Sequence, residues 1–302
     1  MAPQPSDSEV GTPSAAASLR AMPTVLLVGC GRMGGALARR WLEYGLPPEK
    51  LAIVEPDKDA VTHRMAPMTG FAVYTDLKTF PRALKPRILV LAVKPQIIPG
   101  VLDEIRCVLA PETVLLSIAA GIRICYLQEN LHPTTPIIRA MPNTPAAIGR
   151  GMTVAIANGQ ASDTDRRHIS ALLTAAGQLV WIEDETLIDA VTAVSGSGPA
   201  FLFLFMEAMA DAAISVGLPD ALANAISRET VLGAVMLTDR RSDSASTLRE
   251  EVTSPGGTTE AALEILMAED GMTTLMRRAV TAAKDRAIIL SGNGQEAMSK
   301  RR

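Results

Sequence analysis

The sequence contains few aromatic residues, cysteines and histidines. Aromatic residues make up 3% of its 302 residues, and it has three histidines and three cysteines, Cys30, Cys107 and Cys125. An odd number of cysteines without a C-x-x-C spacing predicts neither a disulfide framework nor a metal site. We therefore expect free structural thiols, no bound metal and a cytoplasmic protein, because the cytoplasm keeps thiols reduced.

The sequence also lacks an excess of charge of one sign. It has 29 Lys and Arg against 32 Asp and Glu, and its one basic run is formed by the last three residues, 300–302. This balance disfavours nucleic acid and acidic membrane surfaces as partners. The most apolar segment, residues 199–218, is interrupted by Glu207 and Asp211. These charges disfavour a membrane-spanning helix, so no membrane partner is expected.

The amino-terminal segment lacks an apolar stretch. Residues 1–22 are rich in Ala, Ser and Pro and show no hydrophobic periodicity. A secretory signal needs an apolar core, and Asp7 and Glu9 with the single arginine Arg20 disfavour a transit peptide. We therefore predict that residues 1–22 form a disordered tail.

A glycine-rich turn follows directly. Residues 25–28 are all apolar, and after them comes a G-x-G-x-x-G pattern that leads into apolar residues at helical spacing. This strand, turn and helix are typical of dinucleotide-binding domains, in which the helix N-terminus attracts the phosphates. The predicted cofactor-binding residues of the turn are Gly29, Cys30, Gly31, Arg32, Met33 and Gly34.

An acidic residue supports this interpretation. A second strand is predicted at residues 51–54, and Glu55 comes directly after it, at the place where an acid binds the adenine ribose hydroxyls. The alternative is an ordinary strand–helix turn in which the glycines serve only packing.

The chain up to residue 185 alternates between predicted strands and helices, which indicates a mostly parallel, doubly wound sheet. No strand is predicted after about residue 186. The predicted fold is therefore α/β, with a Rossmann-type dinucleotide-binding domain at 23–185 and an all-helical dimerisation domain at 186–302. Helices are expected in the latter domain at 189–194, 199–216, 219–238, 257–267 and 271–290.

One predicted helix is apolar on every face. Residues 201–206 read Phe-Leu-Phe-Leu-Phe-Met, and such a helix must be covered all round. We expect a second subunit to cover it, the alternative being burial against the chain's own sheet domain.

The stretch 252–260 carries a second glycine-rich pattern. Ser254 before Pro255 is a favourable helix cap, and Gly256 and Gly257 expose backbone N–H groups beside two threonine hydroxyls. Glycines in a first turn cost about 1 kcal/mol each, so their presence suggests close approach of an anionic ligand.

A side-chain base is missing from the expected places. None of the three histidines, His63, His132 and His168, is predicted at a strand end or in the helical domain, where Lys284 is the one lysine before the tail. Oxidation of a hydroxyl needs a base, whereas reduction of a protonated imine does not. The sequence therefore favours imine reduction.

Taken together, these segments resemble the pyrroline-5-carboxylate reductase family. The resemblance covers residues 24 to about 290 and rests on motifs that occur in family order, namely Gly29-x-Gly31-x-x-Gly34, Ala92-Val93-Lys94-Pro95, Ala119-Ala120-Gly121, Met141-Pro142-Asn143-Thr144-Pro145, Ser195-Gly196-Ser197-Gly198-Pro199-Ala200 and Ser254-Pro255-Gly256-Gly257-Thr258-Thr259. It implies reduction of a small cyclic imino acid, 1-pyrroline-5-carboxylate, to L-proline with NADPH or NADH. It also implies a homodimer, which in this family is often assembled into decamers.

The resemblance assigns site residues. The substrate carboxylate would lie on N–H groups around Ser254, Gly256, Gly257 and Thr258, and Thr259 would be the catalytic residue that hydrogen-bonds the ring nitrogen. Further cofactor-site residues implied by the resemblance are Ala92, Lys94 and Ala120, beside Glu55, which its place after the second strand assigns. Two positions depart from the family pattern: Glu55 where many members have small or polar residues, and Glu251 where some have asparagine.

Two other functions remain as alternatives. A β-hydroxyacid dehydrogenase would need a lysine in a Gly-x-x-x-Lys setting, but Leu202 stands at that place after Gly198. A non-catalytic NAD(P)-binding protein would not need the substrate turn, but residues 254–259 are intact.

Overall fold

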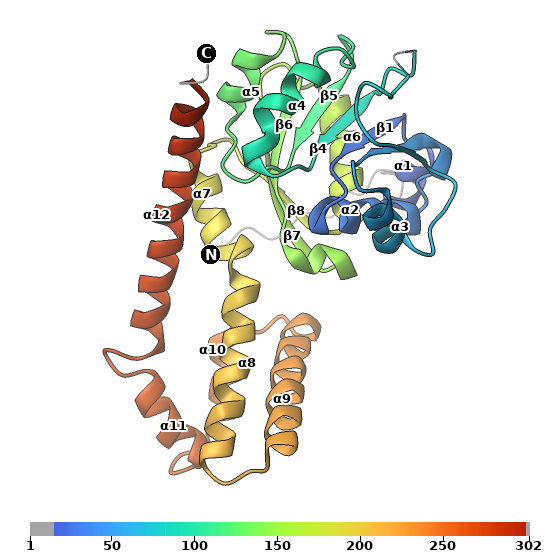
Figure 1. Cartoon of the computed structure of the whole chain (residues 1–302). Helices are drawn as coiled ribbons and strands as arrows, with labels where there is room; N and C mark the ends of the chain where they lie inside the picture. Colours follow the sequence, from blue (N-terminus) through green and yellow to red (C-terminus); the bar gives the residue numbers. More distant parts are fainter. Residues whose placement is uncertain (1–14, 82, 300–302) are drawn as a thin grey trace. The chain divides into compact units, whose positions relative to one another are not determined.

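The computed structural model describes residues 15–81 and 83–299. It divides into two compact units, one up to Gly196 and again from Arg286, the other from Ser197 to Asp285. Figure 1 labels the elements of both units.

The first unit is built on a sheet of eight strands within the described residues, ordered β3-β2-β1-β4-β5-β6-β7-β8. All neighbouring strands are parallel except β6 and β7. Continuous apolar runs with little charge favour such central strands. The strands are β1 (Val25–Val28), β2 (Leu51–Val54), β3 (Ala72–Tyr74), β4 (Ile88–Leu91), β5 (Val114–Ser117), β6 (Ile137–Met141), β7 (Gly151–Ala157) and β8 (Gly177–Trp181).

Helices cover both faces of this sheet (Figure 1). Alternate residues of a strand point to opposite faces, so Leu27 joins a core with Trp41, and Leu26 joins the other core with Leu102. The covering segments are α2 (Arg32–Glu43), η1 (Pro48–Lys50), α3 (Lys58–Met65), η2 (Pro95–Ile97), α4 (Ile98–Ile105), α5 (Ile124–Asn130), η3 (Thr144–Ile148) and α6 (Asp163–Thr174). The prediction of a mostly parallel sheet wound on both sides is confirmed.

The strand order reverses between β1 and β4. From β1 the chain continues outward to β2 and β3 and then crosses back to β4 on the other side of β1. The register pairs Val28 with both Val54 and Leu91, so the three strands end at the same level. Ligands of such sheets bind at this reversal, beyond the carboxyl ends of the strands.

The predicted tail needs correction. Residues Ala15–Arg20 form helix α1, which packs against α6, and Leu19 and Met22 are buried in one of the two sheet cores. Residues 15–22 therefore belong to the folded unit, because Leu19 and Met22 pack into its core although the sequence shows no hydrophobic periodicity there. The rest of the predicted tail, residues 1–14, lies outside the described residues.

The chain after β8 is helical in its described part. It contains α7 (Leu187–Val191), the π-helical turn η4 (Thr192–Gly196), α8 (Gly198–Ser215), α9 (Asp220–Arg240), α10 (Ala245–Glu251), α11 (Thr258–Leu266) and α12 (Met272–Ser299). Helix α10 is the one that the sequence pattern did not predict. By packing, α7 belongs to the sheet unit, since Ile188 is buried in its core. The boundary between the units therefore lies after Gly196 rather than at 185/186.

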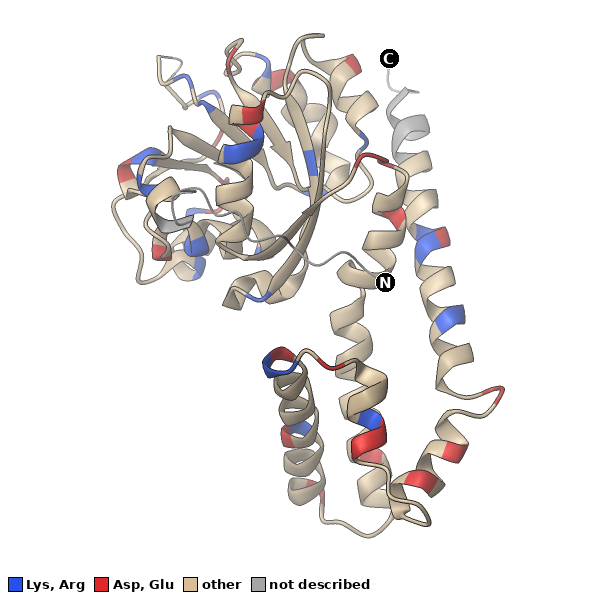
Figure 2. Ribbon diagram, turned by 180° about the vertical axis from the view of Figure 1, so that it is seen from behind, with Lys and Arg blue, Asp and Glu red and all other residues tan. Residues whose placement is uncertain are grey.

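Helix α8 is as apolar as the sequence suggested, and Figure 2 shows few charged residues along it. Phe203 and Leu204 have exposed fractions of 59% and 64% within the single chain. The stretch Leu187–Ser215 is long and apolar enough to cross a membrane, by length and composition only. An exposed apolar surface of this kind is typical of a contact with a membrane or with a second protein chain.

Candidate active site

A cavity of about 530 Å³ lies at the strand-order reversal of the sheet unit. The glycine turn contributes Gly29 and Gly31 to its wall, β2 is followed there by Glu55, and β4 is followed by Ala92 and Lys94. Five of the predicted cofactor residues thus converge on one space. Their position matches the place where a dinucleotide binds such a sheet.

The glycines of the turn have different reasons to be glycine. A Cβ on Gly29 would lie 2.8 Å from the Ala92 carbonyl oxygen, at a φ of +95°, and one on Gly34 would lie 2.2 Å from the Gly29 oxygen. Packing therefore explains these two. A Cβ on Gly31 would meet no protein atom within 4 Å, although Gly31 lines the cavity. Packing therefore does not explain Gly31, which faces open space at the cavity.

The other turn residues, Cys30, Arg32 and Met33, connect these glycines or begin helix α2, whose N-cap is Gly31. The Cys30 side chain is buried, and burial followed by the negative charge of Glu55 raises the pKa of its thiol to about 11. The thiol stays protonated at neutral pH, so Cys30 is a packing residue rather than a redox centre.

Two opposite charges bind the backbone of Cys30. The Glu55 carboxylate accepts a hydrogen bond from the Cys30 N–H at 2.8 Å, and Arg64 donates from Nη1 to the Cys30 carbonyl oxygen at 2.9 Å. Both side chains line the cavity. Glu55 is thereby held beside the glycine turn at the end of β2, and Arg64 places a cation close to it. Sequence reasoning missed Arg64, because its place depends on how α3 packs against the glycine turn.

Ala120 and Asn143 lie after β5 and β6. Ala120 is exposed and is not among the residues that line the cavity. Asn143 accepts a hydrogen bond from the Met152 N–H at 2.8 Å and donates to the carbonyl oxygen and to Oγ of Ser195, each at 3.2 Å. It thus ties the loop after β6 to the π-helical turn η4, a conformation that is frequent at functional sites.

The segment Ser254–Gly257 forms a turn rather than the start of a helix. The Gly257 N–H donates to the Ser254 carbonyl oxygen at 2.9 Å, and Gly256 has a φ of +70°. Pro255 at the second position and a left-handed glycine at the third make this a type II turn. The N-cap of α11 is Gly257, so the prediction that Ser254 caps the helix is wrong.

This turn also changes the argument from its glycines. The left-handed φ favours glycine at 256, and a Cβ on Gly257 would lie 2.8 Å from the Ser254 carbonyl oxygen. The turn itself therefore requires both residues, so they are not by themselves evidence of a ligand. The feature that still favours a ligand is the set of N–H groups at the N-terminus of α11. In the first turn of this helix Thr258 is exposed and Thr259 is half-buried.

Ionic contacts stabilise the segment before the turn. Arg241 forms two hydrogen bonds with Glu251, at 2.6 and 2.7 Å, and a third with Asp243 at 2.8 Å. The hydrogen bonds from Arg241 hold the pKa of Glu251 below its ordinary value. Glu251 thus connects the end of α10 to the loop after α9, shortly before the turn at Ser254.

Comparisons with known proteins bear on this geometry. Residues 185–290 match the family described as pyrroline-5-carboxylate reductase dimerisation, and residues 24–121 match NADP oxidoreductase coenzyme F420-dependent. The pyrroline-5-carboxylate reductase of Pseudomonas aeruginosa is 36% identical over 89% of this chain and 97% of its own length. That of Arabidopsis thaliana is 34% identical over 85% and 92%. The chain belongs to the pyrroline-5-carboxylate reductase family.

Solved structures agree with this membership. A pyrroline-5-carboxylate reductase from Coxiella burnetii is similar with a TM-score of 0.82 and 32% identity, over 89% of this chain and 99% of that one. The Plasmodium falciparum pyrroline carboxylate reductase with NADP bound has a TM-score of 0.75 and 28% identity, over 89% and 98%. The reductase described here is therefore an NAD(P)H-dependent oxidoreductase with a small-molecule substrate, and its dimerisation domain makes it a homo-oligomer.

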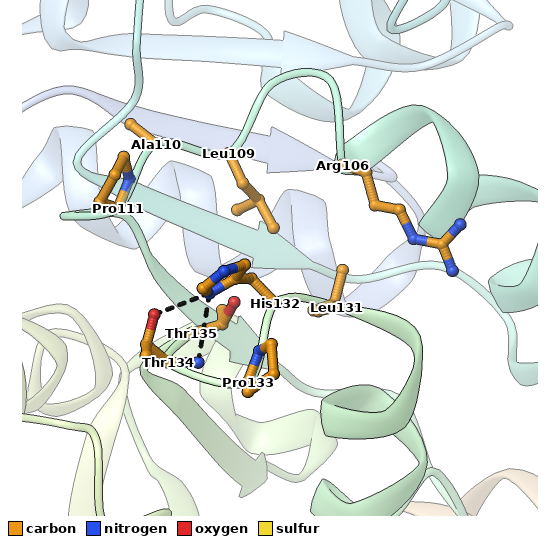
Figure 3. Close-up of a pocket in the computed structure, with 9 residues that line it drawn as sticks. All are labelled: Arg106, Leu109, Ala110, Pro111, Leu131, His132, Pro133, Thr134 and Thr135. Atoms are coloured by element: carbon orange, nitrogen blue, oxygen red, sulfur yellow. Dashed lines mark hydrogen bonds between the residues drawn. The ribbon is translucent and has the colours of Figure 1, made fainter.

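A second cavity of the reductase shares no lining residue with the cavity at the strand-order reversal. It measures about 520 Å³ and is lined by Leu109, Leu131 and His132, among others, near the amino ends of β5 and β6 (Figure 3). His132 Nδ1 lies 2.8 Å from Thr134 Oγ1, as drawn there. None of the predicted site residues lines this cavity. Among the described residues, no group of His, Cys, Asp and Glu could hold a metal ion.

Proposed function

We propose that the glycine turn of the sheet unit binds the cofactor of this enzyme and that residues 254–259 bind its substrate. The enzyme reduces 1-pyrroline-5-carboxylate to L-proline with a hydride that NAD(P)H supplies, the last step of proline biosynthesis. The observation that carries the cofactor assignment is the open space at Gly31 beside Glu55, which packing of the chain does not explain.

In this proposal Gly29, Gly31 and Gly34 shape the pyrophosphate site, with backbone contributions from Cys30, Arg32 and Met33. The first N–H groups of α2 point toward the phosphates, as at other helix N-termini. Ala92 and Lys94 form the cavity wall after β4. Ala120 does not line the cavity, so its contribution would be to the position of the loop after β5.

Glu55 decides between the two cofactors in this proposal. Its carboxylate suits the ribose hydroxyls of NADH and repels the additional phosphate of NADPH. Arg64 offsets part of that repulsion because it binds the carbonyl oxygen of Cys30, the residue whose N–H binds Glu55. We therefore expect NADH to work at least comparably with NADPH.

The substrate carboxylate would bind to backbone N–H groups of the turn and of the start of α11. The Gly257 N–H already donates within the turn, so the donors would be the Gly256 N–H and those of the first helical residues, Thr258 and Thr259. Ser254 would shape the turn and place its hydroxyl beside it. The partial positive charge of a helix N-terminus favours a carboxylate there.

Thr259 would hydrogen-bond the ring nitrogen. This nitrogen begins as a protonated imine and ends as an amine that both donates and accepts. A hydroxyl can follow that change, because it also does both. One short segment would thus hold both ends of the five-membered ring and fix the reacting carbon in place.

Three further expectations belong to this proposal. Dimers assemble further into decamers, the apolar face of α8 is covered by protein rather than by a membrane, and the enzyme works in the cytoplasm. The three cysteines are free thiols, which fits a reducing compartment.

Steady-state kinetics test the proposed function. The protein is mixed with the racemic imine and either cofactor, and the loss of absorbance at 340 nm is followed. Turnover that saturates in the imine, with NADH at least comparable to NADPH, is expected. If the protein binds the cofactor but leaves the imine unreduced, it is a binding protein, and the assignment of residues 254–259 to a substrate site is wrong.

A further inference from the structure

The Gly256 N–H at the substrate turn already bonds to a carboxylate of the same chain. Glu260, in the first turn of α11, accepts a hydrogen bond from this N–H through Oε2 at 2.7 Å. We propose that Glu260 is a specificity-determining residue, because its carboxylate competes with the substrate carboxylate for the Gly256 N–H. The proposal rests on the proposed function of residues 254–259.

The contact differs from an ordinary helix cap. In a capping box, the third residue of the helix bonds back to the N–H of the N-cap residue. Here the N-cap is Gly257, whose N–H donates inside the turn to Ser254, and Glu260 reaches one residue further, to Gly256. The type II turn uses the Gly257 N–H for its own hydrogen bond, and Glu260 binds the Gly256 N–H, which that hydrogen bond does not involve.

The chemistry of the two competitors is the same. The side chain of Glu260 ends in a carboxylate, and so does the imino acid that the turn is proposed to bind. A bound substrate must displace Glu260 from the Gly256 N–H. Glu260 stays anchored in the first turn of α11, four residues after Gly256, so its negative charge remains close to the substrate's and repels it.

This competition lowers the affinity for every ligand with a carboxylate at the turn, the substrate and L-proline alike. It does not affect a ring without that group. Weak binding of L-proline favours release of the product. Exposed charges interact less at high ionic strength, so the penalty should shrink as salt is added.

The test compares two charge-removing variants of the full-length enzyme. Glu260→Gln keeps the size of the side chain and removes its charge. Glu264→Gln, one turn further along the same helix and also exposed, makes the same change of charge away from the turn. Each variant is assayed with the imine that carries a carboxylate and with 1-pyrroline, which does not. Binding of L-proline is measured by calorimetry at low and high salt.

For Glu260→Gln we expect the KM of the carboxylated imine and the Kd of L-proline to fall about fivefold, the size of one close like-charge interaction in water. The KM values for 1-pyrroline and for the cofactor should not change. The decrease in the KM of the carboxylated imine and in the Kd of L-proline should be smaller at high salt. Glu264→Gln should behave like the wild type.

An equal change in both variants, an unchanged or raised KM in Glu260→Gln, or the same change with 1-pyrroline would overturn the proposal. If the KM of Glu260→Gln is unchanged or raised and its melting temperature is lower than that of the wild type, Glu260 is a helix cap only. If the wild type reduces neither imine, the proposed function fails instead, which separates the two failures.

Discussion

At the scale of single residues, Thr259 bears the main chemical prediction. Replacing Thr259 with alanine should lower kcat/KM about 10–100-fold, because the hydroxyl orients the ring nitrogen as charge on it is lost. Thr259→Ser should keep much of the activity, and cofactor affinity and melting temperature should stay near normal in both. Turnover of the alanine variant at the wild-type rate would reduce Thr259 to a helix-start residue.

Glu55 allows a second prediction at this scale. In Glu55→Ser the ratio of kcat/KM for NADPH to that for NADH should rise, because a negative charge beside the additional phosphate is removed. Two charges about 4 Å apart interact by about 1 kcal/mol in water and more in a cavity.

A matched control for Glu55 is Asp59→Ser, on the neighbouring helix α3 but not among the residues that line the cavity. It removes the same charge and should leave the ratio near that of the wild type. An unchanged ratio in Glu55→Ser would remove this residue from the cofactor site.

At the scale of elements, α1 should contribute to stability. Leu19 is fully buried, and truncating a buried leucine costs about 2–5 kcal/mol, with the lower end expected in a terminal helix. Leu19→Ala should therefore lower the melting temperature by several degrees, read by circular dichroism. The exposed neighbour Arg20, changed to alanine, should have almost no effect. A melting temperature unaffected by Leu19→Ala would mean that α1 does not contribute to the fold.

The amino-terminal end of α6 carries a pH-dependent contact. Asp165 is buried, accepts hydrogen bonds from Ser162 and pairs with Arg87 at 2.6 Å. Burial raises the pKa of Asp165, but the hydrogen bonds from Ser162 and Arg87 outweigh it and leave the pKa below its ordinary value. A carboxyl group with a lowered pKa in the folded state stabilises above its unfolded pKa of about 4 and loses that contribution as the pH falls through the folded value.

Asp165→Asn should therefore lower the free energy of unfolding by about 2–4 kcal/mol at pH 7, since it leaves the Arg87 charge without its partner. The loss should become smaller below pH 4, where the wild type loses the same contribution. Urea unfolding at several pH values measures both effects. Asp163→Asn, in the same helical turn but exposed, serves as the control. An Asp165→Asn effect that is equal at pH 7 and pH 3 would contradict the linkage.

At the scale of the whole molecule, assembly and stability should be inseparable. Helix α8 exposes large apolar side chains within the single chain, and burying them between subunits makes the melting temperature depend on protein concentration. A charge within this surface, as in Leu204→Arg, should shift light scattering toward monomers and lower activity. Glu207→Gln on the same helix is the control. A fully active monomer of the wild type at micromolar concentration would contradict this prediction.

The sequence alone determined the layout of the sheet unit and both glycine-rich segments. The continuous apolar run Val25–Val28 forms a buried strand, and the left-handed φ of Gly29 and the close approach of Gly34 to the Gly29 oxygen are local to a strand–turn–helix. The family motifs, in their order along the chain, indicate the reaction. These features depend on residues close together in the chain, which is why patterns reveal them.

Only the tertiary structure decided which side chains meet. Arg64 reaches the Cys30 carbonyl because α3 packs beside the glycine turn, and Asn143 meets Ser195 across 52 positions of the chain. Leu19 is buried because α6 offers it a surface. Even the nearby Glu260 could not be paired with Gly256 until the type II turn had set the direction of that N–H. Such contacts depend on packing and on backbone direction, which the order of residue types does not contain.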